Sequence, residues 1–182
     1  FVTNTGTYTV TVDVSPTLAG LIVGGTNGGT VTVNLSATTL TLNGASYFET
    51  NTVFNFSGGL LAGTGTVIFA GPFTWSGGLM ATTAGRTVFT NSATVSLTTG
   101  NTKTFQQRTV DNYTTVNWTA GPLNIGFAAI WNNLPGASFD LQGDLNAGSI
   151  GGAIPVFNNA GTLRKSAGAG AASFGFSVNN AN

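Results

Sequence analysis

The chain has 182 residues, with 5 Lys+Arg against 5 Asp+Glu, no His and no Cys. Charged residues make up only 5%, against roughly 25% in ordinary soluble domains, so general bases, covalent nucleophiles and metal ligands are nearly absent. We therefore expect no enzyme activity and no cofactor. The net charge of zero also argues against nucleic acid and anionic membranes as partners.

A four-residue signature, apolar, polar, apolar and then Ser or Thr, recurs along the chain from Val12 onward. Its eight occurrences are VDVS at Val12, VNLS at Val33, FNFS at Phe54, FTWS at Phe73, VSLT at Val95, VNWT at Val116, and the looser FDLQ at Phe139 and LRKS at Leu163. Successive starts lie 19 to 24 residues apart. This period is typical of solenoids and is shorter than the roughly 40 residues of a propeller blade.

The signature also predicts which side chains face the core. Successive side chains of a strand point to opposite faces, so the first and third places should face inward and the second outward. The first place holds Val12, Val33, Phe54, Phe73, Val95, Val116, Phe139 and Leu163, and the third holds Val14, Leu35, Phe56, Trp75, Leu97, Trp118, Leu141 and Lys165. Lys165 breaks the apolar pattern, so either the alternation shifts in the last coil or this charge marks the end of the regular stack.

Stacking of successive coils turns these columns into ladders of touching side chains. In a parallel β-helix each coil hydrogen-bonds to the next at ~4.8 Å, so we expect Phe54 to lie on Phe73 and Phe56 on Trp75, with Trp118 further along the second column. Offset aromatic stacking of this kind adds about 0.5–1.5 kcal/mol per pair beyond area burial.

An asparagine recurs before each later coil and predicts a second ladder at a corner. The five residues are Asn91, Asn112, Asn133, Asn159 and Asn180. Asn side chains can hydrogen-bond both to their own turn and to the Asn of the next coil. Gly, Asn and Ser clusters between the short β-prone stretches provide the turns, and no helical periodicity of useful length is present.

These patterns predict an all-β fold, a parallel β-helix (β-solenoid) of about eight coils with 19–24 residues per coil. We expect residues 1–182 to form a single solenoid segment, with eight coils over 12–182 and residues 1–11 as the tail of a preceding coil or a strand leading into the first. Neither end carries a charged, helical or Pro-rich cap, so unpaired strand edges are expected at both. The segment is therefore predicted to belong to a longer rod or to stack end to end, with itself or with flanking solenoid coils.

Two groups of charged residues are candidate sites. Arg86 and Arg108 each precede Thr-Val and take the same place in their coils, so they should stack, and an anionic glycan between them would relieve their repulsion. Asp140 and Asp144 are the only close pair of carboxylates. They lack the neighbouring acids or bases that catalysis or calcium binding requires, so we expect a solvated edge with a contact between Asp140 and Arg164.

The coil length and the residue types of the signature resemble the parallel β-helix repeats of bacterial secreted surface proteins, of the autotransporter passenger and filamentous-haemagglutinin type. The resemblance covers about residues 12–182 and implies a rigid extracellular or cell-surface rod. It provides no active site. Three functions remain open: a structural stalk, fibre or surface-layer segment; an adhesin-like rod that binds glycans; and a polysaccharide-degrading enzyme.

Overall fold

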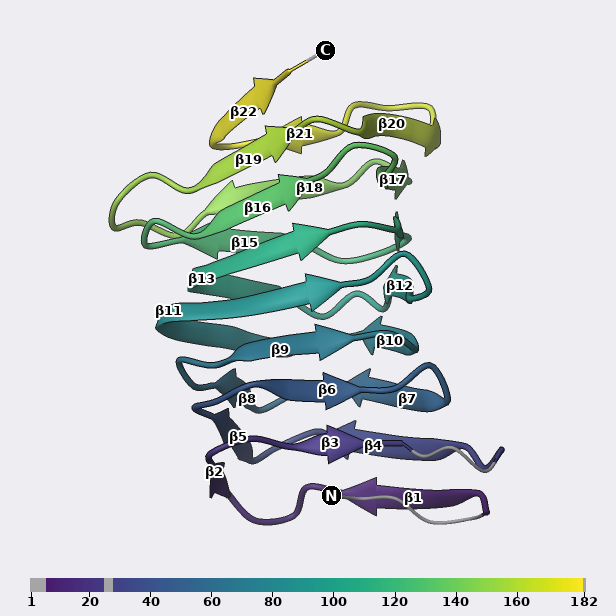
Figure 1. Cartoon of the computed structure of the whole chain (residues 1–182). Helices are drawn as coiled ribbons and strands as arrows, with labels where there is room; N and C mark the ends of the chain where they lie inside the picture. The colour runs from purple at the N-terminus through teal and green to yellow at the C-terminus, as the bar shows by residue number, and fades with distance from the viewer. Residues whose placement is uncertain (1–5, 25–27, 182) are drawn as a thin grey trace.

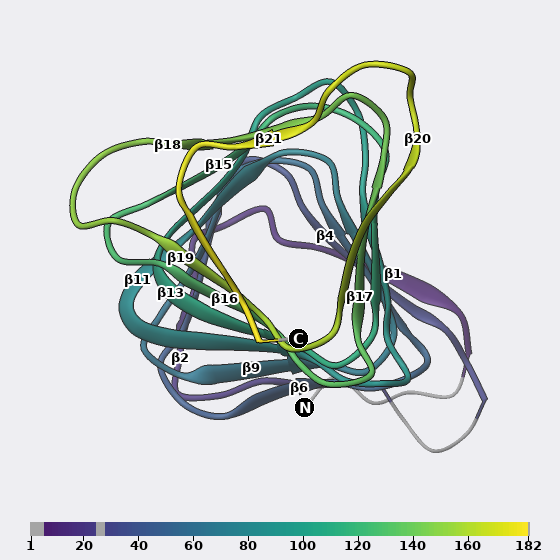
Figure 2. The ribbon, with the colours of Figure 1, turned by 90° about the horizontal axis from the view of Figure 1, so that it is seen from above.

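The structure is a computed structural model that describes residues 6–24 and 28–181. The described chain contains strands and no helix, and it winds into about eight coils stacked from the N-terminal end to the C-terminal end (Figure 1). Viewed along the stack, the coils superpose as a rounded triangle with strands on three faces (Figure 2). The predicted fold, an all-β parallel solenoid, is confirmed.

The three faces contain parallel strands that follow one another at intervals of one coil. Face 1 contains β1 (Tyr8–Thr11), β4 (Val31–Leu35), β7 (Thr52–Phe56), β10 (Pro72–Trp75), β12 (Thr94–Leu97), β14 (Thr115–Trp118), β17 (Ser138–Gln142) and β20 (Thr162–Ala167). Face 2 contains β2 (Thr17–Leu18), β5 (Thr39–Leu42), β8 (Leu60–Ala62), β15 (Leu123–Gly126), β18 (Asn146–Ser149) and β21 (Ser173–Phe174). Face 3 contains β3 (Ile22–Val23), β6 (Ser46–Phe48), β9 (Thr66–Phe69), β16 (Ile130–Asn133), β19 (Val156–Asn159) and β22 (Ser177–Asn180).

Two long strands join the second and third faces. β11 (Gly78–Phe89) and β13 (Lys103–Asn112) each run along face 2 and continue round the corner into face 3. Faces 2 and 3 therefore form one 14-stranded sheet, while face 1 is a separate 8-stranded sheet.

The sequence signature coincides with face 1, and its predicted register is confirmed from the second coil onward. Val33 pairs with Phe54, and the same column continues through Phe73 to Leu163. The third-place column runs in parallel from Leu35 to Lys165. From β4 to β14 these inward side chains are buried, so strand alternation alone separates core from surface here.

The prediction for the first coil is wrong by two residues. Val10, rather than Val12, pairs with Val33, and Val14 is 66% exposed instead of inward-facing. The segment Val10–Val14 alternates Val with polar residues throughout, so its two possible registers have the same pattern. Tyr8–Thr11 forms β1 of the first coil, and the part of the predicted tail at residues 1–5 lies outside the described residues.

The last coil departs from the regular pattern next to Lys165. Lys165 still pairs with Leu141, but the register then shifts so that Gln142 pairs with Ala167. The Lys165 ammonium contacts the Asp144 carboxylate at 2.9 Å and donates to the Gly168 carbonyl at 2.6 Å. Of the two alternatives, a shift is present directly after Lys165, and the charge of Lys165 is paired.

The expected aromatic ladders are confirmed in the centre of the core. The rings of Phe54 and Phe73 stack with their centroids 5.5 Å apart, and those of Phe56 and Trp75 stack at 5.9 Å. Trp118 is fully buried in the same column, and its indole N–H donates to the Gly121 carbonyl at 2.9 Å. Like side chains touch because the parallel pairing places each on its counterpart in the next coil.

Replacement of Trp75 by Ala should lower the free energy of unfolding by about 3–5 kcal/mol, because it leaves a cavity between Phe56 and Leu97 in a fully buried column. Chemical denaturation measures this loss. The neighbouring outward change, Thr74→Ala, should cost no more than about 0.5 kcal/mol. A loss below about 1 kcal/mol for Trp75→Ala would contradict the inward register.

Candidate functional site

The corner that ends face 3 contains an inner column of hydrogen-bonded asparagines. The Asn112 side-chain N–H donates to Asn133 Oδ1 at 2.9 Å, Asn133 donates to Asn159 at 2.7 Å, and Asn159 donates to Asn180 at 2.7 Å. The first three are buried. The predicted Asn ladder is therefore present over these four residues, and every donor in it points toward the C-terminal end.

Asn91 does not belong to this ladder. Phe89 takes the corner place beside Asn112, and Asn91 lies two residues further on, exposed in the turn. In the N-terminal half the corner column is apolar instead, with Val23, Phe48 and Phe69 preceding Phe89. The sequence spacing suggested Asn91, but turn lengths differ from coil to coil, so only the strand pairing identifies the true counterpart.

A second, outer column lies beside the first and was not predicted. Asn132 donates to Asp111 Oδ1 at 2.8 Å, Asn158 donates to Asn132 at 2.9 Å, and Asn179 donates to Asn158 at 3.0 Å. The donors of this column point toward the N-terminal end, opposite to those of the inner column. The signal in the sequence is the Asn-Asn dipeptide at the end of β16, β19 and β22.

The predicted stacking of Arg86 on Arg108 is wrong. Arg108 pairs with Gly85, while Arg86 pairs with Thr109, because β11 contains extra residues between Ala81 and Gly85. Arg86 remains half exposed and forms an ion pair with the buried carboxylate of Asp111.

Arg108 points into the protein and is only 2% exposed. Its guanidinium donates to the Gly63 carbonyl at 3.0 Å, the Arg86 carbonyl at 2.9 Å and Thr87 Oγ1 at 2.8 Å. Burial lowers the pKa of Arg108 to about 10. Arg86 and Arg108 therefore do not present two stacked guanidinium groups on one surface.

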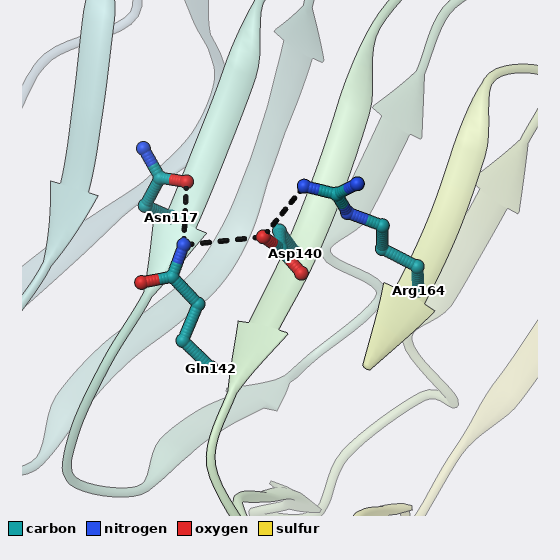
Figure 3. Close-up of polar contacts among 4 residues, drawn as sticks. All are labelled: Asn117, Asp140, Gln142 and Arg164. Carbon is teal, nitrogen blue, oxygen red and sulfur yellow. Dashed lines mark hydrogen bonds and ion pairs between the residues drawn. The ribbon is translucent and has the colours of Figure 1, made fainter. Parts of the chain in front are cut away.

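Asp140 forms the expected contact with Arg164, but it is not solvated. Its carboxylate lies between Gln142 and Arg164, and Gln142 also contacts Asn117 (Figure 3). Arg164 donates to the carboxylate at 3.0 Å and Gln142 at 3.1 Å. Asp140 is 1% exposed. Burial raises the pKa of this carboxyl, but hydrogen bonds from Arg164, Gln142 and Ser166 outweigh it, so the pKa lies below its ordinary value.

Asp144 has a separate partner and does not form a site with Asp140. Hydrogen bonds from the Lys165 ammonium and the Gly170 backbone N–H lower the pKa of Asp144, and the side chain is about half exposed. Each carboxylate is thus held ionised by its own cation. No group of three or more His, Cys, Asp or Glu side chains that could hold a metal ion is found among the described residues.

Lys103 is a buried charge that the sequence reasoning missed. It begins β13, is fully buried, and its ammonium donates to the carbonyls of Thr99, Asn101 and Ala120 at 2.9–3.2 Å. The three ion pairs between described residues involve other cations. Burial lowers the pKa of Lys103 to about 8.

Two hollows on the surface are each lined by an exposed aromatic side chain and by polar side chains. One, of about 480 Å³, is lined by Val88, Thr90, Asn91, Tyr113, Pro135 and Gly136. The other, of about 370 Å³, is lined by Ala84, Gln107, Arg108, Thr109, Phe127 and Ala128. Neither contains a carboxylate, so neither provides an acid–base pair.

The described residues leave the core incompletely covered at both ends of the stack. At the N-terminal end an apolar hollow of about 210 Å³ is lined by Val10, Val12, Leu18, Leu21 and Val23, among others. At the C-terminal end Leu163, Phe174 and Phe176 pack against the core but are only partly buried, and Val178 is 37% exposed. These are the surfaces that a further coil would bury.

Comparison with known proteins gives no assignment, since no protein-family model, curated protein or solved structure matches this chain. No helix in the described part of the chain is long and apolar enough to cross a membrane.

Replacement of Asn179 by Asp should lower the free energy of unfolding by about 0.5–2 kcal/mol at pH 7. The new carboxylate would face Asn158 Oδ1, which is also an acceptor. If every amide of the outer column turned round to relieve this contact, the Asn132 oxygen would face Asp111. Asp111 now accepts from Asn132, so two acceptors would then meet there instead. Chemical denaturation at pH 7 and near pH 3 tests this, because a protonated Asp can donate again.

The matched control is Asn180→Asp, which adds the same charge one residue away. Its carboxylate still accepts from Asn159, as a charge-assisted bond, so stability should change by less than about 0.5 kcal/mol. Equal losses in the two variants would show that the columns have no fixed direction.

The buried lysine predicts a rise in stability with pH. Its pKa is about 8 in the folded chain and 10.5 when unfolded, so between these values the unfolded chain binds more protons and the free energy of unfolding increases, by at most about 3 kcal/mol. Denaturation curves from pH 8 to 10.5 should show this rise in the natural chain and not in Lys103→Met. An equal rise of the free energy of unfolding with pH in both chains would show that Lys103 is not its cause.

Proposed function

We propose that the chain is a structural segment of a secreted bacterial β-solenoid, a stalk, fibre or surface-layer element whose ends join further coils. The fold supports a rod, and the composition and coil pattern support a surface location. The side chains described above do not support catalysis, because Asp111, Asp140 and Asp144 are each paired with a different cation and the buried cations are bonded to carbonyls and a hydroxyl.

One observation carries this proposal: all three faces end in strand edges that are paired on one side only. Among the described residues β1, β2 and β3 each pair with a single strand at the N-terminal end, and β20, β21 and β22 do so at the C-terminal end. An unpaired edge exposes a row of backbone N–H and C=O groups and is a template for another strand.

The incomplete core at each end supports the same conclusion. The N-terminal hollow exposes apolar side chains of β1 and β2 in part, and the C-terminal coil exposes Phe174, Phe176 and Val178 in part. A coil added at either end would pair its backbone with the open strands and bury these side chains together. The gain comes mainly from apolar area removed from water.

Glycan binding is the second role that the sequence suggests, and the structure offers it less support. Arg108 is buried and Arg86 is bound to Asp111, so the candidate pair for contact with an acidic glycan does not present two free cations on one surface.

The isolated chain should associate as its concentration rises, because strand edges and apolar side chains at both ends are left uncovered by residues 6–24 and 28–181. Multi-angle light scattering would show a mass above that of one chain, 18.4 kDa, and electron microscopy would show rods. Leu21→Lys places a charge in the N-terminal hollow and should reduce the association. Thr94→Lys, exposed in the middle of the rod, should not. A compact monomer at high concentration would contradict the proposal.

A further inference from the structure

The two amide columns at the corner of face 3 reach the C-terminal edge with one hydrogen-bonding group each still open. Asn180 accepts from Asn159 and Asn179 donates to Asn158. Within the described residues nothing accepts from Asn180 Nδ2, and nothing donates to Asn179 Oδ1. The edge therefore presents a donor on the inner column and an acceptor on the outer column, on adjacent residues of β22.

The direction of the outer column is determined by its first member. Asp111 is a carboxylate and can only accept, so Asn132 must turn its N–H₂ toward it, which leaves the Asn132 oxygen for Asn158. The same order passes to Asn179. Asp111 thus determines, from three coils away, that an acceptor oxygen lies at the open edge of the outer column.

The inner column has the opposite direction for an equally local reason. Asn112 Oδ1 accepts from the Thr114 backbone N–H at 3.2 Å, and its Nδ2 donates to the Thr114 carbonyl and to Asn133. This turn holds the amide in one orientation. Each following asparagine repeats that orientation, and the column ends at Asn180 with a free donor.

From this geometry we propose that the C-terminal edge selects a partner solenoid coil whose corner strand provides a side-chain donor over Asn179 and a side-chain acceptor over Asn180. An Asn-Asn strand meets both requirements, as it already does at β16, β19 and β22. The inference rests on the proposed function, the joining of coils end to end, and adds the chemistry that the joining coil carries.

A second copy of this chain stacked head to tail is the less well-matched occupant. Continuation of the pairing would place β3 over β22, and so Ile22 and Val23 over the two asparagines. Their side chains contain no hydrogen-bonding group, so the open donor and acceptor would be buried without partners, and a buried unsatisfied polar group is unfavourable. Association of identical copies through the apolar ends is thus weaker than capture of an Asn-bearing coil.

The chain itself provides a matched coil for the test. A copy of residues 136–159 joined after Asn182 puts the copied Ser138 five places after Asn180, the spacing that separates Ser138 from Asn133. The copied Phe139 then lies over Leu163 and the copied Asp140 over Arg164, on the open side of β20. On its other side β20 already pairs with the original Phe139 and Asp140. The copied Asn158 and Asn159 fall over Asn179 and Asn180.

The experiment compares four full-length extended chains by hydrogen exchange of the backbone amides of Ser177–Asn180. The first keeps both copied asparagines. The second has Asn158→Asp in the copy, the third has Asn159→Asp in the copy, and the fourth has Ile and Val at these two places. Both Asp versions add the same charge at the new end of the stack.

The added Asn-Asn coil should slow exchange of the β22 amides by about ten-fold or more relative to the natural chain. The version with Asn158→Asp in the copy should lose most of this protection at neutral pH and regain it below about pH 3.9, where the carboxyl is protonated and donates. The version with Asn159→Asp in the copy should keep it, and the Ile-Val version should lose much of it.

The outcomes separate this inference from the proposed function. Equal protection in all four chains would show that coils join here without selection by the amide columns, which overturns the inference and leaves the joining of coils intact. An absence of protection in every version would show that the edge does not accept a coil, which overturns both.

Discussion

The structure depends on one constraint, the parallel hydrogen bonding of each coil to the next. This pairing places every side chain on its counterpart one coil away, at roughly 4.8 Å, so a residue is chosen by what it touches above and below. Apolar residues stack on apolar ones, rings on rings, and amides on amides. The aromatic pairs Phe54–Phe73 and Phe56–Trp75 and the four-residue Asn column are direct results.

The same constraint explains why the chain has so few charges. Two like charges on successive coils would repel each other at short range, so a charge is tolerated only where its neighbours in the column are neutral or of opposite sign. Asp140 lies between Asn117 and Arg164, and Asp111 lies between Val88 and Asn132. Each ladder can therefore contain an isolated charge, which then orients the neutral amides beside it.

The two buried cations show how a solenoid interior can hold a charge without a carboxylate. A side chain at Gly85 would collide with the Arg108 guanidinium, and one at Gly121 would lie 2.9 Å from the Lys103 ammonium. The missing side chains leave room for the long cations, and nearby backbone carbonyls accept their N–H groups. These residues hold turns in place, and their lowered pKa values are a consequence of burial.

The sequence by itself determined the solenoid, its coil length, and the inward columns of face 1, because strand alternation and stacking force a repeat of residue types that is visible in one dimension. Its errors came where turn length or a bulge changes the count. Val14, Asn91 and the pair Arg86 and Arg108 were each placed by spacing, and each was displaced by one or two residues. A displacement of one residue moves a side chain from the surface to the interior, as Arg108 shows. Only the tertiary structure decided in which direction the amides of each column donate. This direction depends on the hydrogen bonds that Asp111 and Asn112 form with residues of their own turn and of the next coil.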